Sequence, residues 1–596
     1  MKQNHRQAFL NCLLSSVLFL STNLLWAQQA SDQISPEFSH RSAPANSAPG
    51  STLRAKEFIV VAAHPLASEA GFKVLQQGGS AIDAMVTVQT VLGLVEPQSS
   101  GLGGGAFVLY YHAASGQLYS FDGRETAPLK APSDLFLNPD QSPLAFFNAV
   151  VGGLSVGTPG TVKLLSDLHA RFGKQPWPAL LQPAIELAES GFTVTPRLAD
   201  SVARDAHRLQ QIPAASAYFF PENKPFEAGQ LLKNPDYADT LKLLAKHGGD
   251  YFYDSEISRA IVDAVHSHSN KGYLSQQDFS RYQIITRENH CFAYLAYEIC
   301  SMGAPSSGAM ALQQILGMSK HAGLNKLEPK NPLAWQILAE ASRRAFADRS
   351  KYIADPDFFQ TPESLLSDKY LKQRSQEIMP GKASDEVLPG TPEPDMHTAL
   401  VSAASPEQAS TSHFVIVDRD GNILSMTSTI ENAFGSRLFV KGFFLNNELT
   451  DFSFQPKDAN QWIANRVEPG KRPRSSMSPT IVFHQADANL PKQAYLALGS
   501  PGGSRIINFV AQSLISVLAW GEELQTAFDR PHILNRFGKM ELEANTSAAD
   551  FADDFKKMGY EISVQDINSG LHGVIFTKEG MIGAADKRRE GLVLGK

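Results

Sequence analysis

The feature that most constrains this chain is a junction inside residues 402–430, "SAASPEQASTSHFVIVDRDGNILSMTSTI". Before the junction, residues 376–410 are rich in Pro, Ser, Asp and Glu and have no sustained hydrophobic period, which indicates a linker. After it, apolar residues continue on both sides of Asp420-Gly421, a pattern that predicts two paired core strands. The chain therefore passes from a linker into a core strand through three hydroxyl residues, 410–412.

A threonine at this junction can act as a nucleophile, a role that the end of an ordinary linker does not require. Its hydroxyl is a poor nucleophile without a base, but the α-amino group of an N-terminal threonine can take the proton. The reference pKa of such an amine is about 8, so it can accept a proton near neutral pH. This chemistry requires cleavage of the Ser410–Thr411 bond, which the Thr411 hydroxyl can itself attack. Alone, the junction fits an ordinary linker end as well.

Composition places the chain among globular proteins, and composition and motifs together argue against nucleic-acid, metal and cofactor binding. It has 596 residues, 43% of them apolar and 19% charged, which is enough for a large core. Its net charge is −7 and no long basic run occurs, so nucleic-acid binding is not expected. No metal-ligand spacing occurs among the 16 histidines, so no metal is expected. "GLGGGA" at 101–106 resembles a dinucleotide loop, but the strand-like "FVLYY" follows it, and no cofactor is predicted.

The first residues predict export. Lys2 and Arg6 precede an apolar stretch that ends in Leu25-Trp26-Ala27, which is typical of a signal peptide, residues 1–27. An uncleaved anchor is the alternative, but polar residues interrupt the stretch, and no other stretch is long enough to span a bilayer. The sequence therefore predicts a secreted or periplasmic protein. Residues 28–55 are rich in Ser, Pro and Ala, and we expect them to be disordered.

Two cysteines remain after signal removal. Cys291 and Cys300 flank "FAYLAYEI", two short apolar runs that can form a hairpin. An oxidising compartment would let a disulfide persist. The residues leave two possibilities open, a disulfide across the hairpin or two free buried thiols.

Several segments place reactive groups at the ends of predicted strands. "LALGSPGGSRIINFVAQSL" is a strand, a glycine turn and a helix, so the backbone N–H groups of the turn can form an oxyanion hole. Arg124 ends a strand in "FDGRETAP", and an arginine fork suits a carboxylate. Glu448 and Asp451 in "FFLNNELTDFS" suit an ammonium, so the set fits an amino-acid-like substrate. Individually, each charge also fits a solvated loop.

Together these segments resemble the γ-glutamyltransferases (γ-glutamyltranspeptidases), which hydrolyse glutathione and transfer its γ-glutamyl group. The resemblance runs from about Ile59 to the C-terminus, and "TSHFVIVDRDGN" is its most specific motif. The other motifs, in the family's order, are "SGLGGGAF", "FDGRETAP", "GTPGTV", "PSSG", "FLNNELTDFS", "KRPRSSMSPTIV" and "GSPGGSRII".

The resemblance implies a fold and a maturation step. The fold is the N-terminal nucleophile hydrolase sandwich, an α/β structure of four layers, αββα, with additional helices. The precursor cuts itself before the threonine. A large subunit, residues 28–410, and a small catalytic subunit, residues 411–596, then form a heterodimer. The implied partners are glutathione and other γ-glutamyl compounds, with amino acids, dipeptides or water as acceptors.

The resemblance also assigns site residues, one by one. Thr411 matches the nucleophile, and Thr429 matches a threonine that supports it. The remaining matches are Gly502 and Gly503 for the oxyanion hole, Arg124, Ser475 and Ser476 for the α-carboxylate, and Glu431, Glu448 and Asp451 for the α-ammonium.

The sequence departs from the family pattern in two places. Glu431 and Glu448 stand where several members have asparagine and glutamine, and a further negative charge there should favour an ammonium. The stretch from Asp451 to Ser475, which becomes a lid in some members, is shorter here, and its Trp462 is a candidate for the lid's aromatic residue.

Three other functions remain as alternatives. Cephalosporin or glutaryl acylases share the fold and the nucleophile, and the shorter lid leaves room for that activity. A secreted binding protein without catalysis would stay as one intact chain. "GLSVG" at 153–157 matches the nucleophile elbow of serine hydrolases, with Ser155 as nucleophile, but Pro159 and Gly160 follow it closely and no Asp/His pair is evident.

Overall fold

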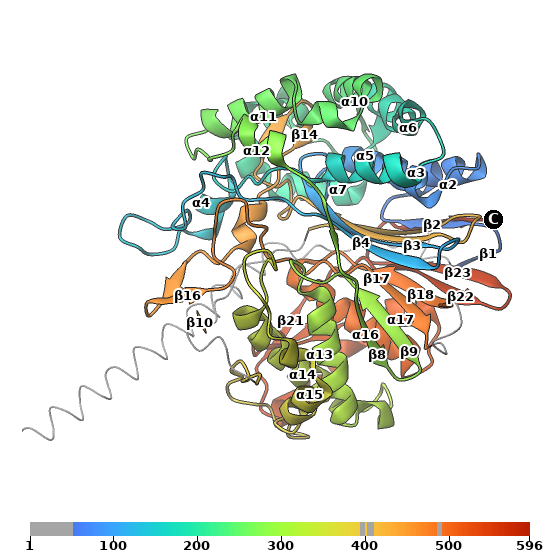
Figure 1. The fold of residues 1–596 in the computed structure, drawn as a ribbon, viewed down its shortest axis with the longest axis vertical. Helices are drawn as coiled ribbons and strands as arrows, with labels where there is room; N and C mark the ends of the chain where they lie inside the picture. Colours follow the sequence, from blue (N-terminus) through green and yellow to red (C-terminus); the bar gives the residue numbers. More distant parts are fainter. Residues whose placement is uncertain (1–51, 394–399, 402–409, 486–491) are drawn as a thin grey trace, which may run out of the picture.

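The computed structural model describes residues 52–393, 400–401, 410–485 and 492–596. Two seven-stranded antiparallel sheets lie face to face, and helices cover the outer face of each sheet (Figure 1). The expected αββα sandwich is therefore confirmed. The expected signal peptide lies outside the described residues. In the described part of the chain, no helix combines the length and the apolar character needed to cross a bilayer.

The first sheet contains the strand that begins at the junction. Its order is β24 (Leu592–Gly595), β2 (Ile59–Ala62), β11 (Ser412–Val417), β12 (Ile423–Thr429), β3 (Gly105–His112), β4 (Gln117–Gly123) and β7 (Ile285–Arg287). The paired strands expected around Asp420-Gly421 are β11 and β12, and β3 and β4 form a second hairpin around Ser115-Gly116. Because β11 pairs with β2 and β12, the residue before it, Thr411, is held inside the molecule.

The second sheet packs under the first and carries the glycine turn. Its order is β1 (Leu53–Ala55), β23 (Gly580–Ala585), β22 (His572–Thr577), β18 (Ala494–Gly499), β17 (Thr480–His484), β9 (Tyr297–Ser301) and β8 (His290–Tyr294). Side chains from both sheets meet between them, among them Val61, Leu109, Val415, Ile481 and Ala497. Each such valine, leucine or isoleucine contributes about 1.5–3 kcal/mol when fully buried.

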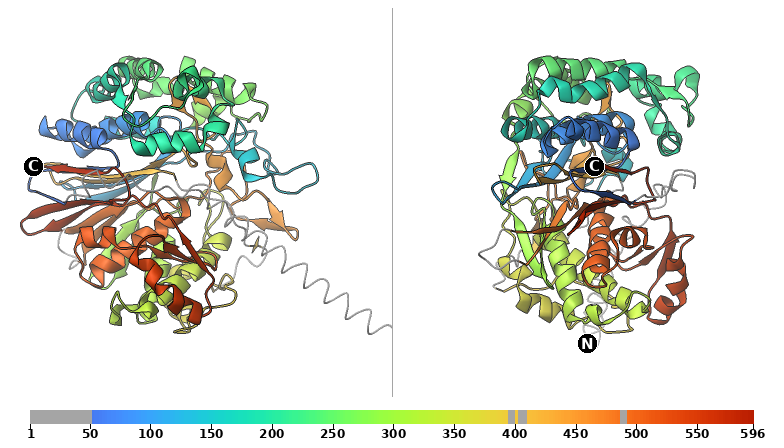
Figure 2. Two further views of the ribbon diagram at one scale, coloured as in Figure 1. Left: turned by 180° about the vertical axis from the view of Figure 1, so that it is seen from behind. Right: turned by 90° about the vertical axis from the view of Figure 1, so that its right-hand side faces the viewer.

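Two helical layers complete the sandwich (Figures 1 and 2). The first sheet is covered by α2 (Pro65–Gln76), α3 (Ala81–Val95) and α5 (Thr161–Phe172), with α6 (Trp177–Ser190), α7 (Pro196–Arg204), α10 (Pro235–His247), α11 (Glu256–Ser267) and α12 (Gln276–Arg281) in the same half of the molecule. The second sheet is covered by α13 (Gly308–His321), α14 (Pro332–Tyr352), α15 (Asp368–Ser375), α16 (Ile506–Leu518) and α17 (Leu524–Asp529).

Shorter elements connect these layers. They are α4 (Phe146–Val150), α8 (Ala206–Leu209), α9 (Pro213–Phe219), α18 (Ala552–Lys557), β5 (Phe192–Thr193), β6 (Leu231–Leu232), β10 (Leu400–Val401), β13 (Phe439–Val440), β14 (Phe443–Phe444), β15 (Lys457–Asp458), β16 (Gln461–Ile463), β19 (Ile533–Leu534), β20 (Met540–Glu543) and β21 (Ile562–Gln565). The 3₁₀ helices η6 (Glu448–Asp451) and η7 (Gly503–Arg505) carry expected site residues.

The expectation that residues 28–55 are disordered is wrong in part. The segment expected to be disordered to residue 55 ends in β1, which pairs with β23 along Leu53–Ala55. The expected linker is also more ordered than its composition indicates. Ser384 donates a hydrogen bond of 2.6 Å to Glu340, and β10 runs parallel to β16. Backbone and polar pairing, which a lack of hydrophobic period does not reveal, holds these described residues in place.

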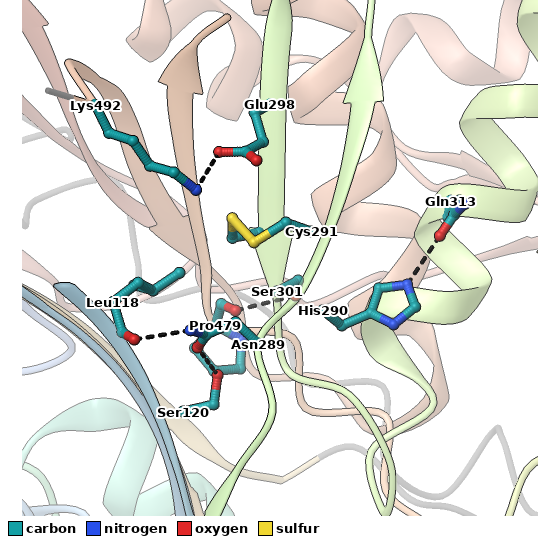
Figure 3. The surroundings of a disulfide bond; sticks show 11 residues. Leu118, Ser120, Asn289, His290, Cys291, Glu298, Ser301, Gln313, Pro479 and Lys492 are labelled. Carbon is teal, nitrogen blue, oxygen red and sulfur yellow. Dashed lines mark hydrogen bonds and ion pairs between the residues drawn. A yellow bond between two sulfur atoms is a disulfide. The ribbon is translucent and has the colours of Figure 1, made fainter. Parts of the chain in front are cut away.

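Cys291 and Cys300 form a disulfide across the β8–β9 hairpin (Figure 3). They face each other directly in the strand register, with Cα atoms 4.1 Å apart. That separation lies just below the roughly 4.4–6.8 Å usual for disulfides, and it is close to the spacing of a non-hydrogen-bonded cross-strand pair. Asn289 donates to the Leu118 carbonyl of the first sheet and so fixes the chain where it crosses between sheets.

Candidate active site

One pocket gathers nearly all of the residues that the resemblance singles out. It lies where β11, the β4 end, η6 and the glycine turn meet. Its lining consists of Arg124, Thr411, Thr429, Glu431, Glu448, Asp451, Ser475, Ser476, Met477, Gly503 and Ile506. Of the ten expected residues, Gly502 alone is not part of this lining, and it directly precedes Gly503 in the turn. The set is drawn from segments more than 370 residues apart in the sequence.

Thr411 lies in the pocket in a strained conformation. Its side chain is 3% exposed, and its hydroxyl donates to the Thr429 hydroxyl at 3.1 Å. Its φ is 115°, a value that β-branched residues rarely adopt and that costs on the order of 1–3 kcal/mol. Ser410, on the other side of the expected cleavage point, is also buried and donates to the Gln98 carbonyl at 2.6 Å. The chain is therefore held firmly on both sides of the Ser410–Thr411 bond.

Thr429 is positioned to hold the Thr411 hydroxyl. It ends β12 directly opposite the start of β11, because Ser412 pairs with Ser428 in the hairpin register. The Thr429 hydroxyl also accepts a hydrogen bond of 2.9 Å from the backbone N–H of Glu431. A hydroxyl fixed from two sides can orient Thr411 without itself taking part in bond formation.

The glycine turn presents backbone N–H groups beside the threonine. Gly502 and Gly503 have φ of 135° and 59°, values that glycine adopts without strain. Within the described residues, neither of their N–H groups donates to a protein acceptor. Gly503 begins η7, which runs into α16, so the turn also stands at the positive end of a helical segment. This arrangement suits a developing oxyanion.

Arg124 is fully buried and paired with two carboxylates. Its Nη1 pairs with Glu448, and its Nη2 lies 2.5 Å from Asp451 Oδ2. Backbone carbonyls of Pro473 and Arg474 accept further hydrogen bonds of 3.1 Å from the guanidinium. Burial alone would lower the pKa of Arg124, but Glu448 and Asp451 raise it above its ordinary value. Thus, the residues assigned to the α-carboxylate and to the α-ammonium are paired with each other.

Glu448, which pairs with Arg124, and its neighbour Glu125 are both buried carboxyl groups with raised pKa values. Burial raises the pKa of Glu125 to about 8, although Arg124 opposes the shift. Burial also raises the pKa of Glu448 well above its ordinary value, and the negative charges of Glu125 and Glu431 add to that effect. Two close carboxyl groups titrate as a pair, so Glu125 and Glu448 together retain a proton near neutral pH. Glu431 accepts a hydrogen bond from the Asn447 side chain.

Ser475 and Ser476 are fixed by a facing loop. Ser475 N–H donates to the Pro305 carbonyl at 3.0 Å, and its carbonyl accepts from Ser307 N–H at 2.8 Å. The Ser476 hydroxyl accepts a hydrogen bond of 2.9 Å from Arg349. This loop follows β9, so the disulfide-bonded hairpin leads directly into the wall of the pocket.

Two candidate residues lie outside the site. Trp462 is 44% exposed and packs against Lys457, whose Nζ lies 3.9 Å from the ring centroid. It is not part of the pocket lining, so the expectation that it replaces the lid's aromatic residue has no support from the geometry. Ser155 is buried, and its hydroxyl donates to the Val150 carbonyl at 2.7 Å. Ser155 lies in a turn and not in the strand-to-helix elbow that a serine-hydrolase nucleophile occupies, so the geometry argues against Ser155 as a nucleophile.

Sequence reasoning missed several residues of the site. Glu125 stands beside Arg124 in "FDGRETAP", so the motif itself contained the signal. Met477 and Ile506 follow assigned residues and add an apolar wall. Arg349 and Arg589 reach Ser476 and Thr411 from distant segments. Their contacts depend on tertiary structure, and no local pattern indicated them.

Comparison with known proteins gives a consistent result. A family model described as gamma-glutamyltranspeptidase matches residues 67–595. A glutathione hydrolase proenzyme of Bacillus subtilis (strain 168) is 34% identical over 551 residues, which cover 91% of this chain and 92% of that protein.

Two solved structures resemble the model over different lengths. A cephalosporin acylase from Bacillus halodurans has a TM-score of 0.79 at 25% identity and covers 94% of this chain and 99% of its own. A gamma-glutamyltranspeptidase from Helicobacter pylori has a TM-score of 0.53 at 33% identity and covers 56% of this chain and 95% of its own. The second name fits the main prediction from the sequence, and the first name fits the acylase alternative.

Proposed function

Because this chain belongs to the γ-glutamyltranspeptidase family, we propose that it is an exported, self-cleaving glutathione hydrolase and γ-glutamyltransferase that uses Thr411 as its nucleophile. The observation that carries this proposal is one pocket in which a strained, buried threonine faces a guanidinium, three carboxylates and a glycine turn. A γ-glutamyl amide offers a reactive carbonyl, an α-carboxylate and an α-ammonium. The pocket has a matching group for each.

Maturation is the first step of the proposal. The Thr411 hydroxyl attacks the Ser410 carbonyl, and hydrolysis of the resulting ester leaves subunits of residues 28–410 and 411–596. The positive φ of Thr411 supports this step. The angle φ is defined by the carbonyl carbon of the preceding residue, so cleavage removes the constraint and releases the strain. The product is a heterodimer whose small subunit begins with a free α-amino group.

Turnover then follows in two balanced steps. The α-amino group of Thr411 takes the hydroxyl proton, Oγ1 bonds to the γ-carbonyl carbon, and the N–H groups of Gly502 and Gly503 stabilise the oxyanion. The C–N bond breaks as the new ammonium returns its proton to the leaving amine. Water or an acceptor amine attacks the threonyl ester with the same amine as base, and Oγ1 recovers a proton. Thr429 keeps the hydroxyl in place throughout.

Substrate recognition involves an exchange of partners. In the ligand-free pocket, Arg124 is paired with Glu448 and Asp451. The α-carboxylate of a substrate takes over the guanidinium, with Ser475 and Ser476 as hydroxyl donors, and its α-ammonium takes over the carboxylates. Two buried ion pairs are thus replaced by two others. A ligand with only one of the two charges leaves buried groups unpaired, which is unfavourable.

The acylase activity is the second candidate. The structural likeness to a cephalosporin acylase favours it. A glutaryl group has the carboxylate of a γ-glutamyl group but lacks its ammonium. Because Glu431, Glu448 and Asp451 would then lack a cationic ligand, we assign acylase activity a minor role. A binding protein without catalysis fits poorly, since the pocket contains the threonine, the glycine turn and the arginine that the resemblance assigns to catalysis and substrate binding.

Hydrolysis by the wild type and by a Thr411→Ala variant tests the proposal. The purified wild type should release p-nitroaniline from γ-glutamyl p-nitroanilide, and an acceptor dipeptide should accelerate the release. Thr411→Ser keeps a hydroxyl and should retain part of the activity, whereas Thr411→Ala should have none. Comparable activity of Thr411→Ala and wild type would contradict the assignment of the nucleophile.

A further inference from the structure

A buried arginine that is hydrogen-bonded to the Thr411 carbonyl takes no part in the cleavage and turnover steps above. Arg589 is 3% exposed, and its Nη1 donates a hydrogen bond of 3.0 Å to the Thr411 carbonyl. Its Nε donates to the Ser569 carbonyl at 3.1 Å. No carboxylate accepts a hydrogen bond from it within the described residues. A buried cation that is paired only with neutral carbonyls is unfavourable, so its position requires an explanation.

The fold brings Arg589 to this place from the far end of the chain. It lies in the turn between β23 of the second sheet and β24 of the first sheet. β24 pairs with β2, and β2 pairs with β11, the strand that follows Thr411. Arg589 thus reaches the Thr411 carbonyl from the turn that joins the two sheets, and it is not part of the pocket lining. A Cβ on Gly570 would meet the Arg589 side chain at 2.6 Å, so the guanidinium has little freedom to move.

Other charged groups surround Thr411 from several elements. Near Arg589 lie Glu96, Arg197, Asp586, Glu590 and the buried histidines His413 and His572, and in the pocket lie Arg124, Glu431, Glu448 and Asp451. Most are engaged elsewhere. Glu96 accepts from the Ser412 hydroxyl at 2.9 Å and faces Arg197, and Arg588 neutralises Asp586. Arg589 is the charged group among the described residues that is hydrogen-bonded to Thr411 itself.

The charge of Arg589 persists at the pH of the reaction. Burial, together with the positive charge of Arg197, lowers the pKa of Arg589 to about 9. The guanidinium therefore stays protonated at neutral pH. The α-amino nitrogen of a cleaved Thr411 is only two bonds from the carbonyl carbon whose oxygen Arg589 holds. A fixed positive charge this close disfavours a second one on the amine.

We propose that Arg589 is a positioning residue for the nucleophile, a role that rests on the function proposed above. Its guanidinium fixes the Thr411 carbonyl and so directs the hydroxyl and the freed amine into the pocket. Its charge keeps that amine neutral and able to accept the hydroxyl proton. No bond to Arg589 forms or breaks, and the proton moves between Thr411 Oγ1, the α-amino group and the leaving amine.

The test is the pH profile of kcat/KM for γ-glutamyl p-nitroanilide in the mature heterodimer. Arg589→Gln removes the charge, so the midpoint of the acidic limb should rise by about one pH unit. Arg589→Lys keeps the charge and should shift the limb much less, although it loses the second hydrogen bond. Arg437→Gln is a matched control, because Arg437 is a buried arginine that donates to the Gly435 carbonyl at 2.6 Å. It should lower the melting temperature without moving the limb.

The outcomes separate this inference from the proposed function. An acidic limb that is the same in wild type and mature Arg589→Gln would overturn the inference while leaving the function intact. An inactive wild type would overturn the function instead. If Arg589→Gln folds but stays uncut, cleavage restored by Arg589→Lys supports the role of the charge, and absence of cleavage in both contradicts it.

Discussion

Arg124 and Asp451 form a buried ion pair inside the same pocket as Thr411, with 2.5 Å between Nη2 and Oδ2. The resemblance assigns these residues to opposite charges of the substrate, yet in the free protein they neutralise each other. Each of the two residues therefore has an oppositely charged partner while the pocket is empty. A zwitterionic ligand supplies a new partner to both residues when it enters, whereas a singly charged ligand supplies a partner to only one of them.

Asp451→Asn should reduce the selectivity for γ-glutamyl over glutaryl substrates. The wild type should prefer γ-glutamyl p-nitroanilide by roughly tenfold or more, which corresponds to about 1.4 kcal/mol. The asparagine loses the charge that attracts the α-ammonium, so kcat/KM should fall for the γ-glutamyl substrate and much less for the glutaryl one. Asp458→Asn, an exposed change on β15, is the control. Equal losses on both substrates would show that Asp451 does not face the ammonium.

Arg124→Lys should lower kcat/KM for the γ-glutamyl and the glutaryl substrate to a similar degree. A lysine keeps the positive charge but cannot form the two parallel hydrogen bonds of the guanidinium fork. Both substrates carry the same carboxylate, so the ratio of their kcat/KM values should stay near that of the wild type. A selective loss on one substrate would contradict the assignment of Arg124 to the carboxylate.

Glu125→Gln should remove one transition from the pH dependence of KM. The pKa of Glu125 is raised to about 8 and Glu125 titrates together with Glu448, so this pair of carboxyl groups gains a negative charge as the pH rises through that range. That charge lies beside the ammonium site, and it should lower KM for γ-glutamyl p-nitroanilide as the pH rises from 7 to 9. The glutamine variant imitates the protonated form throughout. The ratio of the wild-type KM to the KM of Glu125→Gln cancels the titration of the substrate itself. A ratio that stays constant between pH 7 and 9 would show that Glu125 does not titrate in this range.

Buried histidines should make the protein sensitive to acid. Burial lowers the pKa of His64 and His572 to about 4, below the unfolded value of 6.5. Unfolded chains take up protons below pH 6.5 while the folded protein does not, so stability should fall between pH 6.5 and 4 by about 1.4 kcal/mol per unit for each histidine. His64→Asn keeps the acceptor for Leu66 N–H and should reduce this loss in urea titrations. His207→Asn is the control at an exposed position and should leave this loss of stability unchanged.

Most of the fold could be predicted because its strands and helices have clear periods. The β11–β12 and β3–β4 hairpins follow from alternation around Asp-Gly and Ser-Gly turns. β1 and β10 could not be predicted, because they are short strands whose order comes from backbone pairing with β23 and β16. The motifs located the pocket lining, but they could not reveal that Arg124 pairs with Glu448 and Asp451, since that depends on where η6 packs.

The intact mass and N-terminal sequence of the purified protein test the central claim most directly. Wild type should separate on a denaturing gel into two chains, and the smaller should begin at Thr411 and contain residues 411–596. Thr411→Ala should fold and remain a single chain, because no hydroxyl is left to attack the Ser410 carbonyl. A fully active wild type that remains a single uncut chain would contradict the account.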